Sequence, residues 1–253
     1  MDDLNVLYAV GESCPFDSVL VREMKRSVDS LLKLNLRRFR VPQQNLAKYS
    51  ALDIVKQALE LLFEFSPSEK NYREAMRTIR VYAEDDEEML TTLQSSFRLI
   101  ANAVYNAYAG QRRVEAMEPQ TLFLQGVPFD TGELQRSFRF VGVRPPEVSP
   151  PSVHKVVFLD EGFEAYKDIL GGKISEEKVE RGREEHWAGI ILRSFDRAGK
   201  NLLRVGLNHV EPPGPLSNLA GSGERRLGKL LRSGDIELQI IDRIADVNKV
   251  FGK

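Results

Sequence analysis

The sequence has few of the residues that bind metals through thiolates or imidazoles. Its 253 residues include three histidines and a single cysteine, Cys14. One cysteine excludes an intrachain disulfide and a metal site with several thiolates. The acids Asp2 and Asp3 stand where a signal peptide has its basic region, and no apolar run approaches the roughly 20 residues that span a bilayer. We therefore expect a cytoplasmic protein with no membrane partner.

The chain also lacks an excess of charge of either sign. Its 36 Lys and Arg residues against 37 Asp and Glu residues give a net charge of -1, so no global field recruits nucleic acid. The basic clusters at residues 25–26, 37–40 and 112–113 have acids nearby and lack interleaved aromatic residues. We expect a small-molecule ligand or substrate and no nucleic acid partner.

Hydrophobic periodicity predicts strands that alternate with helices. Strands are expected at residues 4–10, 36–41, 121–127, 138–143, 153–159, 201–207 and 236–241. Helices are expected at residues 18–34, 50–65, 69–108 (broken near 84–86), 163–170, 176–197 and 224–232. This order predicts an α/β fold with a central, mostly parallel sheet flanked by helices.

The domain organisation follows from the same pattern. We expect a single α/β domain over residues 1–253, with a helical insertion at about residues 69–110. The proline-rich segment 144–151 is either a long surface loop or a domain boundary.

His209 is the first candidate site residue. It follows the predicted strand 201–207 directly, and the segment Glu211 to Pro215 (EPPGP) allows neither a helix nor a central strand. The imidazole is therefore expected at the carboxyl end of a strand, where open α/β sheets bind ligands. It would serve there as a metal ligand or a proton acceptor. A histidine that only bonds a loop carbonyl remains equally open.

Glu12 and Arg183 are the other two candidates. Glu12 ends the first predicted strand, so in a parallel sheet it shares an edge with His209 and could form a general-base pair or half of a metal site with it. The alternative is an acid that stabilises a helix N-terminus. Arg183 precedes Trp187 by one helical turn and would reach the same edge as an anion clamp, unless its helix face is solvated.

These residues resemble a known group of proteins. The Gly11-Glu12 turn after the first strand, and REEHWAGII followed by NLLRVGLNHV, are similar to the erythromycin esterase-like, ChaN-like and Tiki/TraB-like superfamily. The resemblance implies that Glu12, Arg183 and His209 face a common cleft. In that superfamily such clefts serve hydrolysis, with or without a metal, or haem binding, so a divalent metal held by Glu12 and His209, or a haem, is implied. Many members place a histidine shortly after the glutamate, where this chain has Ser-Cys-Pro.

A second resemblance points to a different class. PFDTGELQRS, at residues 128–137, is similar to a signature of phage head–tail connector and tail-completion proteins. There the segment builds a sheet that assembles into a ring, which implies a structural homo-oligomer. The hypotheses are therefore a hydrolase-like or ligand-binding protein, in which water is activated at the Glu12–His209 pair, and a structural assembly protein.

Overall fold

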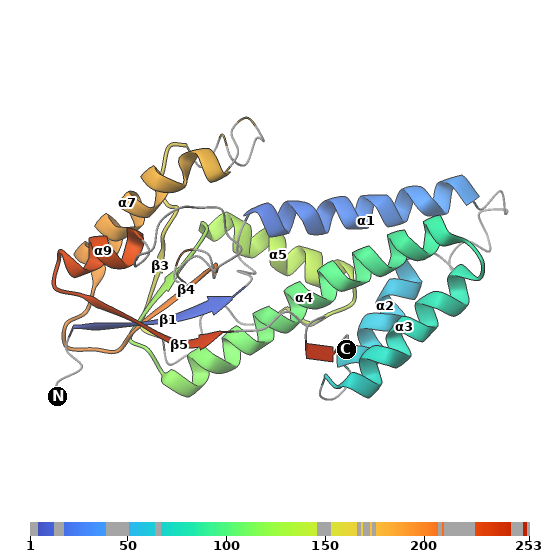
Figure 1. The fold of residues 1–253 in the computed structure, drawn as a ribbon, viewed down its shortest axis with the longest axis horizontal. Helices are drawn as coiled ribbons and strands as arrows, with labels where there is room; N and C mark the ends of the chain where they lie inside the picture. The colour runs from blue at the N-terminus through green and yellow to red at the C-terminus, as the bar shows by residue number, and fades with distance from the viewer. Residues whose placement is uncertain are drawn as a thin grey trace. The chain divides into compact units, whose positions relative to one another are not determined.

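The chain divides into two compact units. A computed structural model describes residues 5–12, 18–38, 51–63, 67–145, 153–165, 168, 173, 176–206, 209, 226–243 and 250–251 (Figure 1). The first unit comprises residues 1–19, 106–132 and 146–244, and the second comprises residues 20–105, 133–145 and 245–253. None of the described helices is long and apolar enough to cross a membrane.

The first unit is built on a parallel sheet. Its strands are β1 (Val6–Glu12), β2 (Thr121–Leu124), β3 (Lys155–Phe158), β4 (Asn201–Gly206) and β5 (Glu237–Arg243). They are arranged in the order β3-β2-β4-β1-β5, and every neighbouring pair is parallel. The predicted α/β fold with a largely parallel sheet is confirmed.

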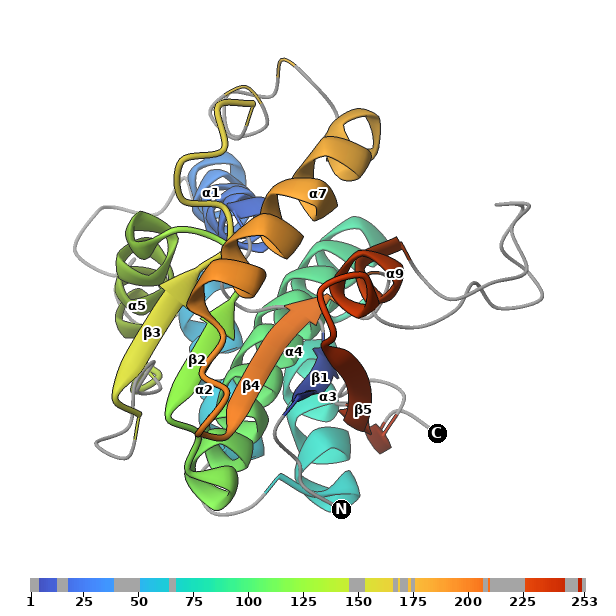
Figure 2. The same ribbon diagram turned by 90° about the vertical axis from the view of Figure 1, so that its left-hand side faces the viewer.

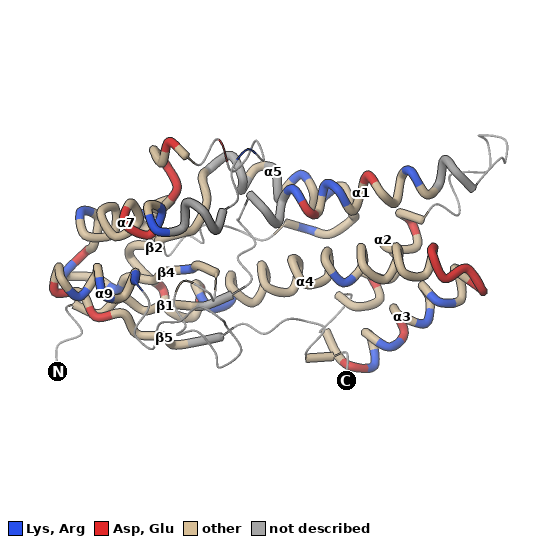
Figure 3. Tube along the Cα trace, turned by 45° about the horizontal axis from the view of Figure 1, so that its top comes forward, with Lys and Arg blue, Asp and Glu red and all other residues tan. Residues whose placement is uncertain are grey.

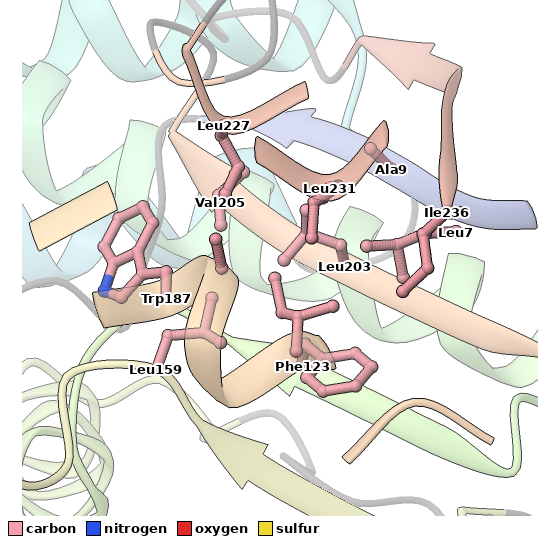
Figure 4. Packing of buried hydrophobic residues seen from close by; sticks show 12 residues of the cluster. Leu7, Ala9, Phe123, Leu159, Trp187, Leu203, Val205, Leu227, Leu231 and Ile236 are labelled. Atoms are coloured by element: carbon pink, nitrogen blue, oxygen red, sulfur yellow. The ribbon is translucent and has the colours of Figure 1, made fainter. Parts of the chain in front are cut away.

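Two helices, α7 (Glu176–Ser194) and α9 (Arg226–Arg232), cover one face of this sheet (Figure 2). Alternate strand residues point to this face, as expected for a period of two. Phe123, Leu203 and Val205 pack there with Trp187 of α7 and Leu231 of α9 in one buried apolar cluster (Figure 4). This cluster fixes α7 on the sheet.

Arg204 alternates with Leu203 and Val205 and so points to the opposite face. It is fully buried, and its guanidinium lies against Gly110 of α4 (Glu87–Met117). A Cβ atom at Gly110 would come within 1.8 Å of Arg204 Nη2. The glycine therefore provides the space that this buried side chain occupies.

The second unit is helical. It contains most of α1 (Ser18–Arg38), α2 (Ala51–Phe63), α3 (Glu69–Ala83), the first part of α4 and the end of α5 (Pro128–Phe140). The predicted break near residues 84–86 is confirmed: the Ser68 hydroxyl caps the start of α3 and the Asp86 carboxylate caps the start of α4. The helical insertion expected at about residues 69–110 lies largely in this unit, which begins at residue 20.

Two strand predictions were wrong. Residues 36–38 end α1, while the rest of the expected strand 36–41 lies outside the described residues. Residues 138–140 end α5 and are followed by a turn, because Phe138 and Val141 are both buried at helical spacing. The sheet implied for PFDTGELQRS by the phage resemblance is also not formed, since this segment is helical. Most of the short helix expected at 163–170 lies outside the described residues.

The position of Leu203 in the sheet leads to a stability prediction. This side chain is fully buried between α7, α9 and the neighbouring strands, so Leu203→Ala should lower the free energy of unfolding by about 2–5 kcal/mol. The control Leu192→Ala, at a residue of α7 that is 40% exposed, should cost under about 1 kcal/mol. Urea unfolding followed by circular dichroism measures both; equal losses would contradict the described core.

Candidate functional site

The carboxyl edge of the sheet carries a buried carboxylate, Asp160, two residues beyond β3. It is 1% exposed and accepts hydrogen bonds from three residues. The backbone N–H of Gly126, beyond β2, donates to Oδ2 at 2.8 Å. Arg183 of α7 donates from Nε and Nη2 at 2.7 Å each, and Trp187 donates from Nε1 at 2.8 Å. One carboxylate therefore ties two strand ends to α7.

The neighbouring strand ends are joined in the same way. The backbone N–H of Gly206, at the end of β4, donates to Oε1 of Gln125, beyond β2, at 2.8 Å. Gly206 is in turn the register partner of Glu12, at the end of β1. The carboxyl ends of β3, β2, β4 and β1 thus form one continuous edge.

The strand order marks a particular place along this edge. The chain leaves β2 for β3 on one side and leaves β4 for β5 on the other. The carboxyl ends of β2 and β4 therefore flank a topological switch point, which is where open α/β sheets bind their ligands. Gln125 and Gly206 lie at this switch point, and His209 follows Gly206 by three residues.

One face of α7 supplies the groups that pack on this edge. Arg183 and Trp187 are one turn apart, and the Arg183 guanidinium lies 4.7 Å from the centre of the Trp187 ring. Both side chains are fully buried. The positive charge of Arg183 is balanced by Asp160 and by the face of the indole, so a cation is tolerated in an otherwise apolar core.

His209 lies beside this pair and is held by a second carboxylate. Its Nδ1 is 3.0 Å from Oε1 of Glu184, and the two side chains are only 2% and 6% exposed. Its ring meets the Trp187 ring edge-on, with centroids 4.7 Å apart. An ionised carboxylate only accepts hydrogen bonds, so Nδ1 carries the hydrogen and, in the neutral ring, Nε2 carries the lone pair.

The structure therefore brings two of the three predicted residues to the same edge with their side chains described. Arg183 and His209 both contact Trp187. For Glu12, the structure gives the backbone position, which is at the end of β1 and next to β4. The anion that Arg183 binds in this structure is Asp160 of the same chain.

Sequence reasoning missed Asp160 and Glu184. The signal for Asp160 was present, because it follows a correctly predicted strand just as His209 does. Glu184 lies three residues before Trp187, a spacing that places both on one face of a helix. Its place in the polar run Arg183-Glu184-Glu185-His186 suggested a solvated helix face. In the structure only part of the run is exposed: Glu185 binds Arg226, and His186 Nε2 meets the Glu161 carbonyl at 3.0 Å.

The residues present give little support to a metal at this edge. A catalytic zinc site uses three protein ligands, whereas the predicted set offers only Glu12 and His209. Within the described part of the chain, no three His, Cys, Asp or Glu side chains are grouped closely enough to hold a metal ion.

No protein-family model, curated protein or solved structure matches this chain. The superfamily resemblance drawn from the sequence motifs thus remains a prediction, and any function of this chain depends on the residues of the site itself.

The buried ion pair leads to a second stability prediction. Asp160→Asn should cost about 3–5 kcal/mol of unfolding free energy, because Arg183 stays buried without its counter-charge. Adding Arg183→Met should recover part of that loss, since no unpaired charge then remains in the core. The control Glu161→Gln changes the exposed neighbouring acid and should change stability by no more than about 0.5 kcal/mol. Urea denaturation of the native protein, the double variant and the single variants Asp160→Asn, Arg183→Met and Glu161→Gln measures these values; a loss in the double variant equal to the sum of the Asp160→Asn and Arg183→Met losses would contradict the pairing.

Proposed function

We propose that the carboxyl edge of the sheet is a hydrolytic site in which His209 is the general base. The buried hydrogen bond between Glu184 and His209, at the end of a strand beside the switch point, is the observation that carries this proposal. A carboxylate that holds the Nδ1 side of an imidazole fixes its tautomer and stabilises the imidazolium that forms when Nε2 takes a proton. This arrangement suits the activation of a water molecule.

The other residues have distinct roles in this proposal. The backbone of Glu12 ends β1 in register with Gly206 of β4, and the three residues from Gly206 to His209 span at most about 10 Å, so Glu12 lies on the same edge as His209. It would orient the water or the substrate beside His209. Asp160 and Arg183 hold α7, and with it Glu184, against the sheet. Arg183 is thereby assigned a positioning role in place of the anion clamp predicted from the sequence.

The chemistry needs only groups of this chain. His209 Nε2 accepts a proton from water as the water oxygen attacks an electrophilic carbon or phosphorus centre. Nε2 then returns the proton to the leaving group, while Glu184 stabilises the transient imidazolium. The buried surroundings strengthen the Glu184–His209 interaction, because the local dielectric is low.

The tautomer of His209 provides a direct test of the Glu184 contact. Long-range ¹H–¹⁵N spectra of the neutral ring should show the hydrogen on Nδ1 in the native protein. Glu184→Ala should change the His209 signals and leave those of His186, which is bonded to a backbone carbonyl, in place. A native His209 with its hydrogen on Nε2 would contradict the proposed base.

Activity is tested on p-nitrophenyl acetate, p-nitrophenyl butyrate and p-nitrophenyl phosphate. His209→Ala and Glu12→Gln should each lower kcat/KM at least about 100-fold, because they remove the base and its neighbour. Glu184→Gln should lower kcat/KM about tenfold or more, because the imidazolium loses its counter-charge.

Two matched controls separate chemistry from folding. His186→Ala and Glu185→Gln remove a histidine and a glutamate of α7 that lie outside the Glu184–His209 pair, and both should keep kcat/KM within about twofold of the native value. The thermal midpoint of Glu12→Gln should stay close to the native one. Native protein that hydrolyses none of the three probes faster than His209→Ala would overturn the proposal.

A further inference from the structure

The helix α3 is mostly basic, with Glu69 and Glu74 lying among its cations, and the turn after it is acidic. Lys70, Arg73, Arg77 and Arg80 recur every three or four residues, so they form one stripe along α3, which we call the basic stripe. Residues 84–88 follow as Glu-Asp-Asp-Glu-Glu, which we call the acidic turn. Figure 3 shows the stripe in blue along α3 and the turn in red beyond its end.

Interactions within the chain account for only part of this separation. Within the described residues, the one ion pair made by the basic stripe joins Arg73 to Glu69. Helix dipoles favour Glu87 and Glu88 at the start of α4 and Arg80 at the end of α3. They do not favour Lys70 or Arg73, which lie in the first turns of α3. The stripe is therefore not explained by the stability of its own helix.

An exposed apolar residue lies between the two charged regions. Val81 is 67% exposed, the largest value among the described large hydrophobic side chains. It borders a hollow between α2, α3 and the start of α4, lined by Ile54 and Met89 and flanked by Arg77 and the acidic turn. The surface thus has an apolar centre with positive charge on one side and negative charge on the other.

We propose that this surface docks the same surface of a second copy of the chain, with the two α3 helices antiparallel and a two-fold axis near Val81. In that arrangement each basic stripe lies over the partner's acidic turn, and the two valines meet at the axis. A two-fold interface must be self-complementary, and a stripe and a turn on opposite sides of one apolar residue meet this requirement.

Other occupants fit the charges less well. The acidic turn repels a nucleic acid, and the basic stripe repels a basic peptide. A partner that satisfies both regions must itself carry both signs on either side of an apolar residue, as this chain does. The expected dimer interface is small and polar, so the affinity between the two copies should fall as salt screens the charges.

Sedimentation equilibrium of the full chain over a range of concentrations tests this proposal. A reversible monomer–dimer equilibrium is expected, with a Kd that rises at least about tenfold between about 20 mM and about 500 mM salt. Protein that stays monomeric at the highest concentration, or a dimer that is insensitive to salt, would overturn it.

A charge exchange tests the geometry. The stripe variant carries Lys70→Glu and Arg77→Glu, and the turn variant carries Asp85→Lys and Glu88→Lys; all four positions are exposed, and circular dichroism checks folding. Each variant alone should raise Kd at least about tenfold, because the substitutions cancel most of the net charge of that region and place like charges at two exchanged positions. An equimolar mixture should bind more tightly than either variant alone, because the exchanged residues of one variant then meet exchanged residues of opposite sign in the other.

The control Lys33→Glu with Arg112→Glu reverses two exposed cations elsewhere and makes the same change in net charge as the stripe variant. It should leave Kd unchanged. A mixture that remains monomeric, or a control that weakens the dimer as much as the stripe variant does, would place the interface elsewhere and overturn the proposal.

Discussion

The first unit depends on one buried carboxylate. Asp160 receives a backbone N–H from the end of β2, two N–H groups from Arg183 and the indole N–H of Trp187. Each of these donors would be costly to leave unpaired in the interior. Because the four hydrogen bonds meet on one group, they fix the position of α7 along the strand ends. Glu184 and, through the Trp187 ring, His209 take their places from that helix.

The two units differ in how their charges are placed. The sheet edge of the first unit is buried, and its ionisable groups have polar partners within the chain, with Asp160 bonded to Arg183 and Glu184 to His209. The α3 surface of the second unit has the opposite character, with many exposed charges and a single exposed valine. Such a surface discriminates between partners by its pattern of charge more than by buried area.

The sequence predicted more of the fold than of the site. Parallel strands and the helix break at residues 84–86 follow from periodicity and capping, and the positions of Arg183 and His209 follow from helical spacing and strand ends. Residues 138–143 were misassigned because a short apolar run satisfies both periods. The sequence also could not show which acid pairs with Arg183. That choice depends on β3 and α7 meeting in space, which only the folded chain reveals.

The order of the strands also bears on how the protein is made. β1 is the first described strand to leave the ribosome, yet its two neighbours, β4 and β5, are the last two described strands. Leu7, Ala9 and Val10, all fully buried in the finished fold, therefore wait with both strand edges open while residues 13–200 are synthesised. Long-range pairing of this kind is slow and exposes aggregation-prone edges. Most of the helical second unit, at residues 20–105 and 133–145, can form during that interval, so chaperone dependence should fall on the sheet.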